Sequence, residues 1–283
     1  MKKYCNGGKT EMKLGTLVTL KKEDDIDAKI AKVSELGFEY CQISCWDMEA
    51  YTDEIAEKIL AALGKYNVKI STFWCGWSGK CVWNFYEGPI TLGLVPEAFR
   101  YVRTCDLIKG SDFAKKLGVK QIATHAGFLP EDPNSEKYRG VLCALREVAE
   151  HCKANDQLFL FETGQETPVT LKRTIEDIGL DNVGINLDPA NLLLYGKANP
   201  VDAVDVFGEY IRDVHAKDGC YPTDGRELGK EMPIGQGRVN FPELIKKLKE
   251  KGYDDTLIIE REIKGEKQRI DILAGKEFLE KYI

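Results

Sequence analysis

The chain lacks a hydrophobic run that could cross a membrane, and it lacks the paired cysteines of zinc and redox motifs. No window of its 283 residues approaches about 18 consecutive apolar residues, the length that predicts a membrane-spanning helix. Its nine cysteines form no CxxC pair, and an odd number scattered over such a chain is typical of reduced thiols. The N-terminal stretch MKKYCNGGKTEMKLG is basic but has no apolar segment like that of a signal peptide. We therefore expect a cytoplasmic protein without a membrane partner.

Excess positive charge and a glycine-rich phosphate-binding turn are also missing. The net charge is −6, whereas proteins that bind a phosphate backbone usually present a basic face, so we expect no nucleic-acid partner. No GxGxxG follows the first predicted strand, which disfavours a doubly wound dinucleotide-binding sheet. No Arg/Lys cluster or glycine-rich helix start offers a phosphate cradle, and this favours an unphosphorylated ligand.

Short apolar runs alternate with longer amphipathic stretches from Lys13 onward, which is the pattern of an α/β fold. The predicted strands are 13–19, 39–45, 68–75, 121–126, 157–163, 183–188, 211–217 and 256–262. The predicted helices are 25–37, 52–66, 96–117, 135–155, 170–180, 199–209, 241–252 and 267–282. Eight strands, each followed by a helix, predict a (β/α)8 TIM barrel. We expect residues 1–12 to form a flexible extension and residues 13–283 a single barrel domain.

Two loops are longer than a barrel needs, and both follow the C-terminal end of a strand. Residues 75–95 carry several aromatic side chains, and residues 218–240 are rich in glycine and proline. Barrel active sites are built at this end of the strands, and loops of this length are more often functional than idle. We therefore predict that both loops cover a substrate.

Four of the apolar runs in the C-terminal half end in an acidic residue or a histidine: Glu162, Asp188, His215 and Glu260. Any one alone is more typical of a salt-bridged polar cap on the barrel rim. A charge at the end of a buried strand needs a partner, because desolvation costs several kcal/mol or more. Four at successive strand ends instead predict one site with three carboxylates and an imidazole. Such a set suits a divalent cation, with Mn²⁺ favoured and Mg²⁺, Co²⁺ or Zn²⁺ as alternatives.

Further candidates lie near the same ends of the strands. His125 closes the fourth predicted strand and is expected to point into the barrel mouth, although a packed core histidine is the alternative. Trp74, Trp77 and Trp83 are expected to stack on the C–H faces of a sugar, and ordinary packing of the loop is the alternative. His151 lies within a predicted helix and is expected to be a surface residue.

The order of these motifs resembles the sugar isomerase/epimerase family of xylose isomerase-like barrels, including the D-tagatose 3-epimerase type. The resemblance covers most of the chain from Lys13 onward and is strongest in THAGFLP, FETGQETP, GINLDPANLLLYG, DVHAKDG, IGQGRVNF and TLIIEREI. It implies that Glu162, Asp188, His215 and Glu260 bind the metal, and that the two glutamates act as an acid/base pair on opposite faces of the sugar.

The chain departs from this family pattern at two positions that touch substrate. The histidine that the D-tagatose 3-epimerase type carries three residues after the aspartate is Asn191 here. The arginine after the strand-seven histidine has no match, and Lys217 is the candidate to replace it. AP endonuclease IV-type nucleases share the barrel, but three histidines in the whole chain are too few for their zinc cluster.

The predicted function is a metal-dependent isomerase or epimerase of a small ketose, cyclitol or keto-sugar. A carboxylate would remove the α-proton to give an enediolate, and the second glutamate would return a proton on the other face. A variant with two metals and a hydride shift would use Asp218 and Glu262 as extra ligands. Two alternatives stay open: a lyase that cleaves a 3-keto-glycoside (O- or C-linked) by β-elimination, and a non-catalytic binding subunit. The family also implies a homo-oligomer.

Overall fold

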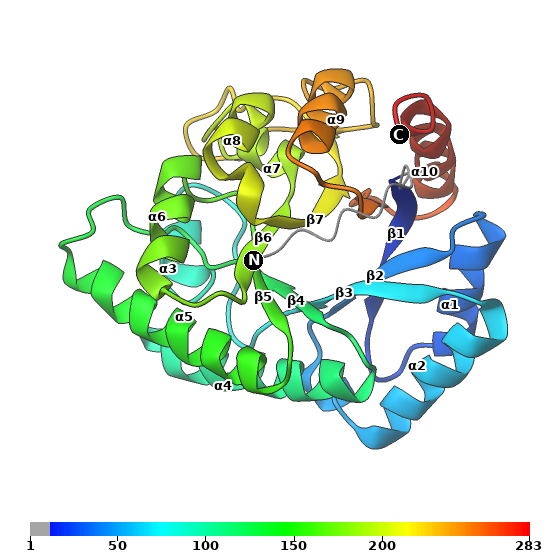
Figure 1. Cartoon of the computed structure of the whole chain (residues 1–283), viewed down its shortest axis with the longest axis horizontal. Coiled ribbons are helices and arrows are strands. Elements are labelled where there is room, and N and C mark those ends of the chain that lie inside the picture. Colours follow the sequence, from blue (N-terminus) through cyan, green and yellow to red (C-terminus); the bar gives the residue numbers. More distant parts are fainter. Residues whose placement is uncertain (1–11) are drawn as a thin grey trace.

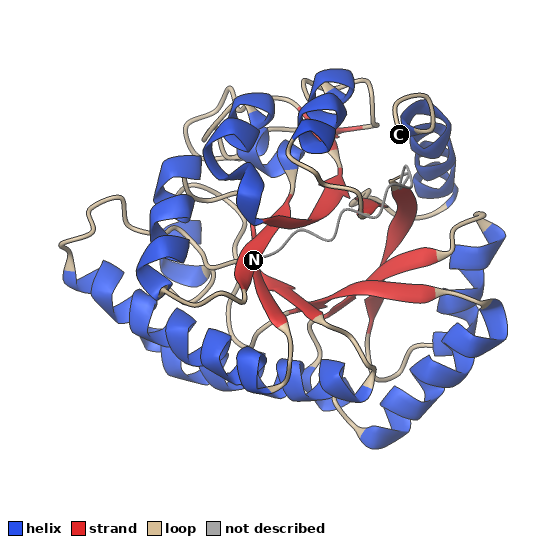
Figure 2. Ribbon diagram, in the orientation of Figure 1, coloured by secondary structure: helices blue, strands red, loops and turns tan. Residues whose placement is uncertain are grey.

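The computed structural model describes residues 12–283, which form a closed barrel of eight parallel strands surrounded by helices (Figure 1, Figure 2). The order around the barrel is β1-β10-β7-β6-β5-β4-β3-β2. The strands are β1 (Lys13–Leu20), β2 (Tyr40–Cys45), β3 (Lys69–Cys75), β4 (Gln121–Thr124), β5 (Leu158–Glu162), β6 (Val183–Leu187), β7 (Ile211–Ala216) and β10 (Thr256–Ile259). The predicted (β/α)8 fold is confirmed. The predicted extension lies outside the described residues except for Met12, which is buried.

All eight predicted helices are present. They are α1 (Ile26–Glu35), α2 (Asp53–Tyr66), α4 (Glu97–Lys116), α5 (Glu136–Ala154), α6 (Pro168–Ile178), α8 (Pro200–Phe207), α9 (Phe241–Glu250) and α10 (Glu266–Leu279). α6 begins two residues earlier than predicted, because Thr167 caps its first turn and Pro168 takes the first helical position. Among the described residues, no helix is long and apolar enough to span a membrane.

Short elements that the sequence pattern did not predict lie at the C-terminal ends of the strands. α3 (Gly88–Thr91) lies in the loop after β3, and α7 (Pro189–Leu194) follows β6 directly. β8 (Asp218–Gly219) and β9 (Glu231–Met232) form a two-stranded antiparallel ribbon within the loop after β7. These elements have two to six residues and therefore show too little periodicity to be recognised in a sequence.

The strands end earlier than predicted where the site residues begin. His125, Asp188 and Glu260 each come directly after a strand, whereas the predicted strands included them. Asp188 instead caps α7, where its Oδ1 accepts the N–H of Asn191 at 2.9 Å. This local hydrogen bond competes with the strand ladder and starts α7 in place of a longer strand. The early strand ends thus free these side chains to reach into the mouth.

The core has two parts that position the site. A large apolar cluster fills the space between the sheet and the helices, and a small one around Trp74, Trp77 and Leu160 packs against Trp46. A polar layer also crosses the interior, where Gln42 of β2 donates hydrogen bonds to Asn186 of β6 and Asp213 of β7. All three of these polar side chains are fully buried, and buried polar groups need hydrogen-bond partners.

Candidate metal centre and sugar site

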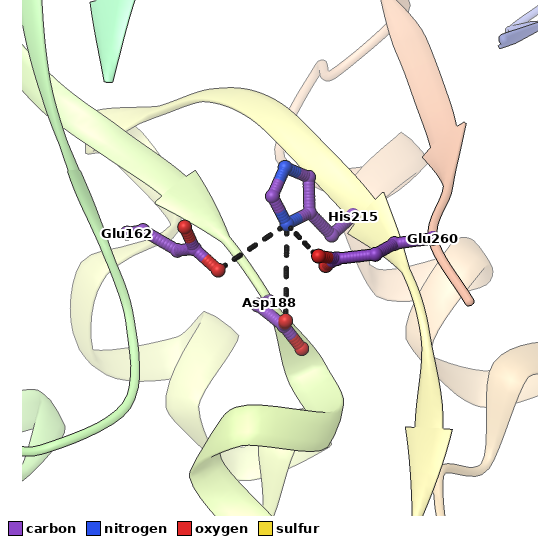
Figure 3. A group of neighbouring side chains, drawn as sticks. All are labelled: Glu162, Asp188, His215 and Glu260. Atoms are coloured by element: carbon purple, nitrogen blue, oxygen red, sulfur yellow. Dashed lines mark ion pairs between the residues drawn. The ribbon is translucent and has the colours of Figure 1, made fainter. Parts of the chain in front are cut away.

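Four consecutive strands of the barrel each contribute one side chain to a single cluster. Glu162 ends β5, Asp188 follows β6, His215 lies in β7 and Glu260 follows β10. Each offers one ligand atom, and these atoms all lie within 4.8 Å of one another (Figure 3). The structure therefore brings together all four residues that the sequence predicted as metal ligands.

The imidazole of His215 lies among the three carboxylates. Its Nδ1 is 3.3 Å from Oε1 of Glu162, 3.1 Å from Oε2 of Glu260 and 3.8 Å from Oδ2 of Asp188. Such separations match those between neighbouring ligands of a cation bonded at about 2.1 Å. Nδ1 of His215, Oδ2 of Asp188 and Oε2 of Glu260 are buried without a hydrogen-bond partner among the described residues. The donor set thus fits a divalent cation, which would compensate these buried groups.

A hydrogen-bond chain behind His215 fixes which ring nitrogen faces the cluster. The Nε2 of His215 lies 2.8 Å from the amide oxygen of Gln42. The amide nitrogen of Gln42 donates to Oδ1 of Asn186 at 2.9 Å and to Oδ2 of Asp213 at 3.0 Å. Because the amide oxygen only accepts, Nε2 of His215 carries the proton that it donates. When the ring is neutral, the lone pair of Nδ1 is therefore directed at the cluster, as a metal ligand requires.

Glu162 is held from three sides. The indole N–H of Trp74 donates to its Oε2, the amide of Asn191 donates to its Oε1 at 3.0 Å, and Nε2 of His125 lies 3.5 Å from Oε2. Burial alone would raise the pKa of Glu162, but the charges of His125 and His215 outweigh burial and hold that pKa below its ordinary value. Glu162 is therefore an ionised carboxylate in a fixed orientation, and three predicted site residues surround it.

Lys217 is a buried ammonium group beside the cluster. Its Nζ lies 3.5 Å from both Asp188 and Glu260, 3.2 Å from Glu262 and 3.4 Å from the amide oxygen of Asn191. Burial lowers the pKa of Lys217, but the surrounding carboxylates more than offset burial and raise it well above its ordinary value. Lys217 therefore stays charged and orients the amide oxygen of Asn191, whose amide nitrogen donates to Glu162.

A cation that binds the cluster is expected to displace a proton from His215. Burial opposes the charged form of His215, yet Glu162 and Glu260 raise its pKa well above the ordinary value. In the absence of a cation the three carboxylates thus retain a proton on the imidazole. A metal that binds Nδ1 must displace this proton, so binding is expected to weaken as the pH falls.

A cavity of about 250 Å³ opens onto the cluster. Four aromatic side chains line it: Trp46, Trp74, Trp83 and Tyr195. His125, Asn191 and Lys217 also line this cavity, as the sequence predicted. Trp77 does not line it, because its ring packs behind Trp46 at a centroid distance of 4.9 Å. Among the predicted tryptophans, Trp77 thus supports the aromatic wall from behind and does not face the ligand space.

The two long loops meet beside this cavity. The N–H of Phe85 in the first loop donates to the carbonyl of Arg226 in the second at 2.8 Å. Trp83 and Leu228, one from each loop, both line the cavity. The first loop is anchored by Arg103, whose buried guanidinium donates to four loop carbonyls, those of Ser78, Lys80, Thr91 and Gly93. Both loops therefore border the cavity, and their covering of a substrate stays a prediction.

Asp218 belongs to the second loop and not to the metal cluster. Its two carboxylate oxygens accept the backbone N–H groups of Gly219, Gly235, Gly237 and Val239 at 2.8–3.0 Å. Both carboxylate oxygens of Asp218 thus stabilise the fold of the loop after β7. Glu262, the other extra ligand of the two-metal variant, pairs with Lys217 and is half-exposed.

Three residues of the site were not predicted from the sequence. Gln42 is a polar residue in the otherwise strand-like YCQISC, and this isolated amide in a buried run was the signal. Trp46 follows the same strand directly and contacts Trp74 at 4.9 Å. Tyr195 ends α7, a helix that the pattern did not predict, so its place in the cavity had no sequence signal.

The comparisons agree with this geometry. Residues 30–282 match the family described as xylose isomerase-like TIM barrel. The structure resembles a xylose isomerase domain protein from Planctomyces limnophilus, with a TM-score of 0.90 and 28% identity over 96% of this chain and 97% of that one. A D-tagatose 3-epimerase-like protein gives 0.74 and 22% over 96% and 97%. A 3-keto-D-glucoside 4-epimerase from E. coli gives 0.70 and 18% over 96% and 100%. The chain therefore belongs to the xylose isomerase-like TIM barrel family.

Proposed function

We propose that this protein is a metal-dependent isomerase or epimerase of a small ketose, cyclitol or keto-sugar. The observation that carries the proposal is the buried cluster of Glu162, Asp188, His215 and Glu260 at the floor of an aromatic-walled cavity. Two solved structures with a similar barrel are described as a D-tagatose 3-epimerase-like protein and a 3-keto-D-glucoside 4-epimerase. Their names support a sugar as the substrate class.

The metal is proposed to be Mn²⁺, with Mg²⁺, Co²⁺ and Zn²⁺ as alternatives, held by the four cluster residues. When bound, the ion supplies a Lewis acid that polarises a carbonyl and a neighbouring hydroxyl group of the sugar. Gln42 keeps Nδ1 of His215 directed at it through the 2.8 Å contact with Nε2. To hold the cation, the imidazole of His215 would have to be neutral, with its proton on Nε2.

Glu162 and Glu260 are proposed to be the acid/base pair. Each carboxylate would exchange a proton with the same carbon from opposite faces of the sugar, which passes through an enediolate. Trp74 and Asn191 fix the two oxygens of Glu162, so this carboxylate is oriented before the substrate arrives. Lys217 lies 3.5 Å from Glu260 and forms an ion pair with it. General acid–base steps of this kind typically contribute about 10²–10⁴-fold each.

Substrate contacts are proposed for His125, Asn191, Lys217 and Trp74, all of which line the cavity. Imidazole, amide and ammonium groups can bind sugar hydroxyls, and the indole face can pack on C–H groups. Trp46 and Trp83 extend this aromatic surface. The combination of aromatic side chains with a few directed polar groups is typical of small-ligand pockets.

A lyase that acts on a 3-keto-glycoside is the second candidate. It would use the same α-proton abstraction and then expel a leaving group from the β-carbon. The half-exposed carboxylate of Glu262 at the cavity edge favours this alternative, because a leaving group there would be near solvent. A non-catalytic binding subunit is disfavoured because all four cluster residues are present.

The test is exchange of substrate protons with solvent. We would load the full chain with Mn²⁺ and incubate it in D₂O with ketoses and 3-keto-glucosides, following deuterium incorporation and products by NMR. An isomerase or epimerase incorporates deuterium at the reacting carbon and gives a new sugar, whereas a lyase releases the aglycone. Glu162→Gln and Glu260→Gln are expected to lose about 10²–10⁴-fold in exchange rate. Full exchange in both variants would contradict the assigned acid/base pair.

A further inference from the structure

A second cavity of about 500 Å³ adjoins the one at the metal cluster. It lies at the C-terminal end of β1, which Figure 1 shows between α1 and α10. We call this second cavity the outer cavity and the one at the metal cluster the inner cavity. The two share five lining residues: Leu17, Ser44, Trp46, Glu260 and Glu262. Because Glu260 is also a member of the metal cluster, the outer cavity begins at the reacting centre and leads away from it.

The chemistry of the outer cavity differs from that of the inner one. Its floor is apolar and buried, formed by residues such as Val18, Val33 and Ile272. Apart from the shared glutamates, the charged residues that line it within the described part of the chain are all cationic: Lys29, Lys32, Arg261 and Lys264. An apolar floor with hydrogen-bond donors at the edge suits a ring that carries hydroxyl or acidic groups.

Two of these cations are already neutralised by the protein. Lys29 pairs with Asp24 at 2.5 Å, and Arg261 pairs with Glu231 at 2.6 Å and with Asp271 at 2.8 Å. Lys32 and Lys264 are exposed at the same cavity. Ion pairs therefore stabilise the walls of the outer cavity, and the ammonium groups of Lys32 and Lys264 are accessible to a ligand.

Size separates the two cavities as well. The inner cavity, at about 250 Å³, is smaller than the roughly 300–1,000 Å³ of pockets that enclose drug-sized ligands, and it suits a single sugar ring. The outer cavity is about twice as large. A free monosaccharide at the cluster would leave the outer cavity to water, although its apolar floor offers binding energy.

We propose that the outer cavity is a substrate subsite, and that the substrate is a glycoside whose keto-sugar ring lies at the cluster and whose second ring or aglycone lies between β1, α1 and α10. This inference rests on the proposed function, because it takes the keto-sugar to bind at the metal cluster. The glycosidic bond passes between Trp46 and Glu262, which line both cavities. Substituent length, and not only the sugar ring, then determines affinity.

The experiment compares methyl, phenyl and glucosyl 3-keto-glucosides on the Mn²⁺-loaded full chain by calorimetry. We expect the two long compounds to bind at least about tenfold more tightly than the methyl compound, the factor that about 1.4 kcal/mol of added contact provides. Thr19→Trp and Lys264→Trp, which fill the outer cavity, should abolish this gain and leave methyl binding unchanged. Lys267→Trp is the matched control, because Lys267 is exposed three residues further on and does not line the cavity.

Equal binding of the three compounds, binding of none, or a gain that survives both cavity variants overturns the subsite. NMR product analysis on the same samples tests the reaction separately. If long substituents bind more tightly but no proton exchange or product appears, the subsite stands and the proposed reaction fails. If methyl and long compounds turn over with the same KM, the reaction stands and the subsite fails. Thermal melting of each variant verifies that it is folded.

Discussion

Replacing Gln42 by leucine should weaken metal binding although Gln42 is not itself a ligand. The substitution removes the acceptor that lies 2.8 Å from Nε2 of His215, so the ring loses the contact that directs Nδ1 at the cluster. It also removes both donors to Asn186 and Asp213, which are fully buried. Loss of such an orienting partner typically costs about 10- to 100-fold in metal affinity, equivalent to about 1.4–2.7 kcal/mol.

The same substitution should also lower the free energy of unfolding. Oδ2 of Asp213 keeps only a long contact of 3.4 Å with the hydroxyl of Ser71 once the amide of Gln42 is gone. A buried acceptor that loses its partner costs about 1–3 kcal/mol. Metal affinity and stability therefore have to be measured separately, the first by competition with a fluorescent chelator and the second by urea unfolding of the metal-free protein.

Gln157→Leu provides the matched control. Gln157 is also a buried amide that bonds Ser111 and the carbonyl of Val119, and it directly precedes β5, at the opposite end of this strand from Glu162. We expect a similar loss of stability and no change in metal affinity. The reasoning is refuted if folded Gln42→Leu binds Mn²⁺ as tightly as the wild type, or if Gln157→Leu weakens metal binding to the same degree.

Three further predictions concern the loop, a buried acid and the buried ammonium. Arg103→Met should destabilise the protein by about 2–4 kcal/mol in urea unfolding, because four loop carbonyls lose their donor, and limited proteolysis should then cut first within 75–95. Burial raises the pKa of Glu166 to about 8, above its usual 4.5, so its contribution to stability is full below pH 4.5 and is lost as the pH rises through 8. Unfolding free energies of Glu166→Gln should therefore fall less than those of the wild type between pH 5.5 and 8.5, and parallel curves would contradict this assignment. Lys217→Met should lower kcat/KM by about 100-fold or more but keep or strengthen Mn²⁺ binding, because the ammonium lies 3.5 Å from two ligand carboxylates and competes with the cation. Weaker metal binding in this variant would show that Lys217 helps to build the cluster.

The barrel and its cluster could be predicted because both follow from local patterns. Runs such as LFLFE and VGINL are typical of buried parallel strands, and the carboxyl ends of such strands meet in a barrel. Acidic residues or a histidine at four of these ends were therefore expected to meet at one site in the mouth of the barrel. The chemistry of Glu162, Asp188, His215 and Glu260 could be inferred from residue types alone.

Other parts of the site depend on contacts between distant segments and could not be predicted. The partnership of Gln42 with His215 joins residues 173 positions apart, and no local pattern specifies it. Trp74 and Trp77 are equally plausible in sequence, but Trp74 lies in β3 and lines the cavity, whereas Trp77 follows β3 and packs against Trp46. Asp218 follows a histidine-containing strand as a ligand would, yet four backbone N–H groups of its own loop bind it.

The most direct test of the central claim is the metal content of the purified chain, measured by mass spectrometry beside the double variant Glu162→Gln/Glu260→Gln. The cluster predicts about one divalent ion per chain in the wild type, with Mn²⁺ preferred on reconstitution, and its loss in the double variant. It also predicts that added Mn²⁺ raises the melting temperature of the wild type only. A wild-type protein that neither retains nor is stabilised by any divalent ion would contradict the proposed metal centre and favour a binding role.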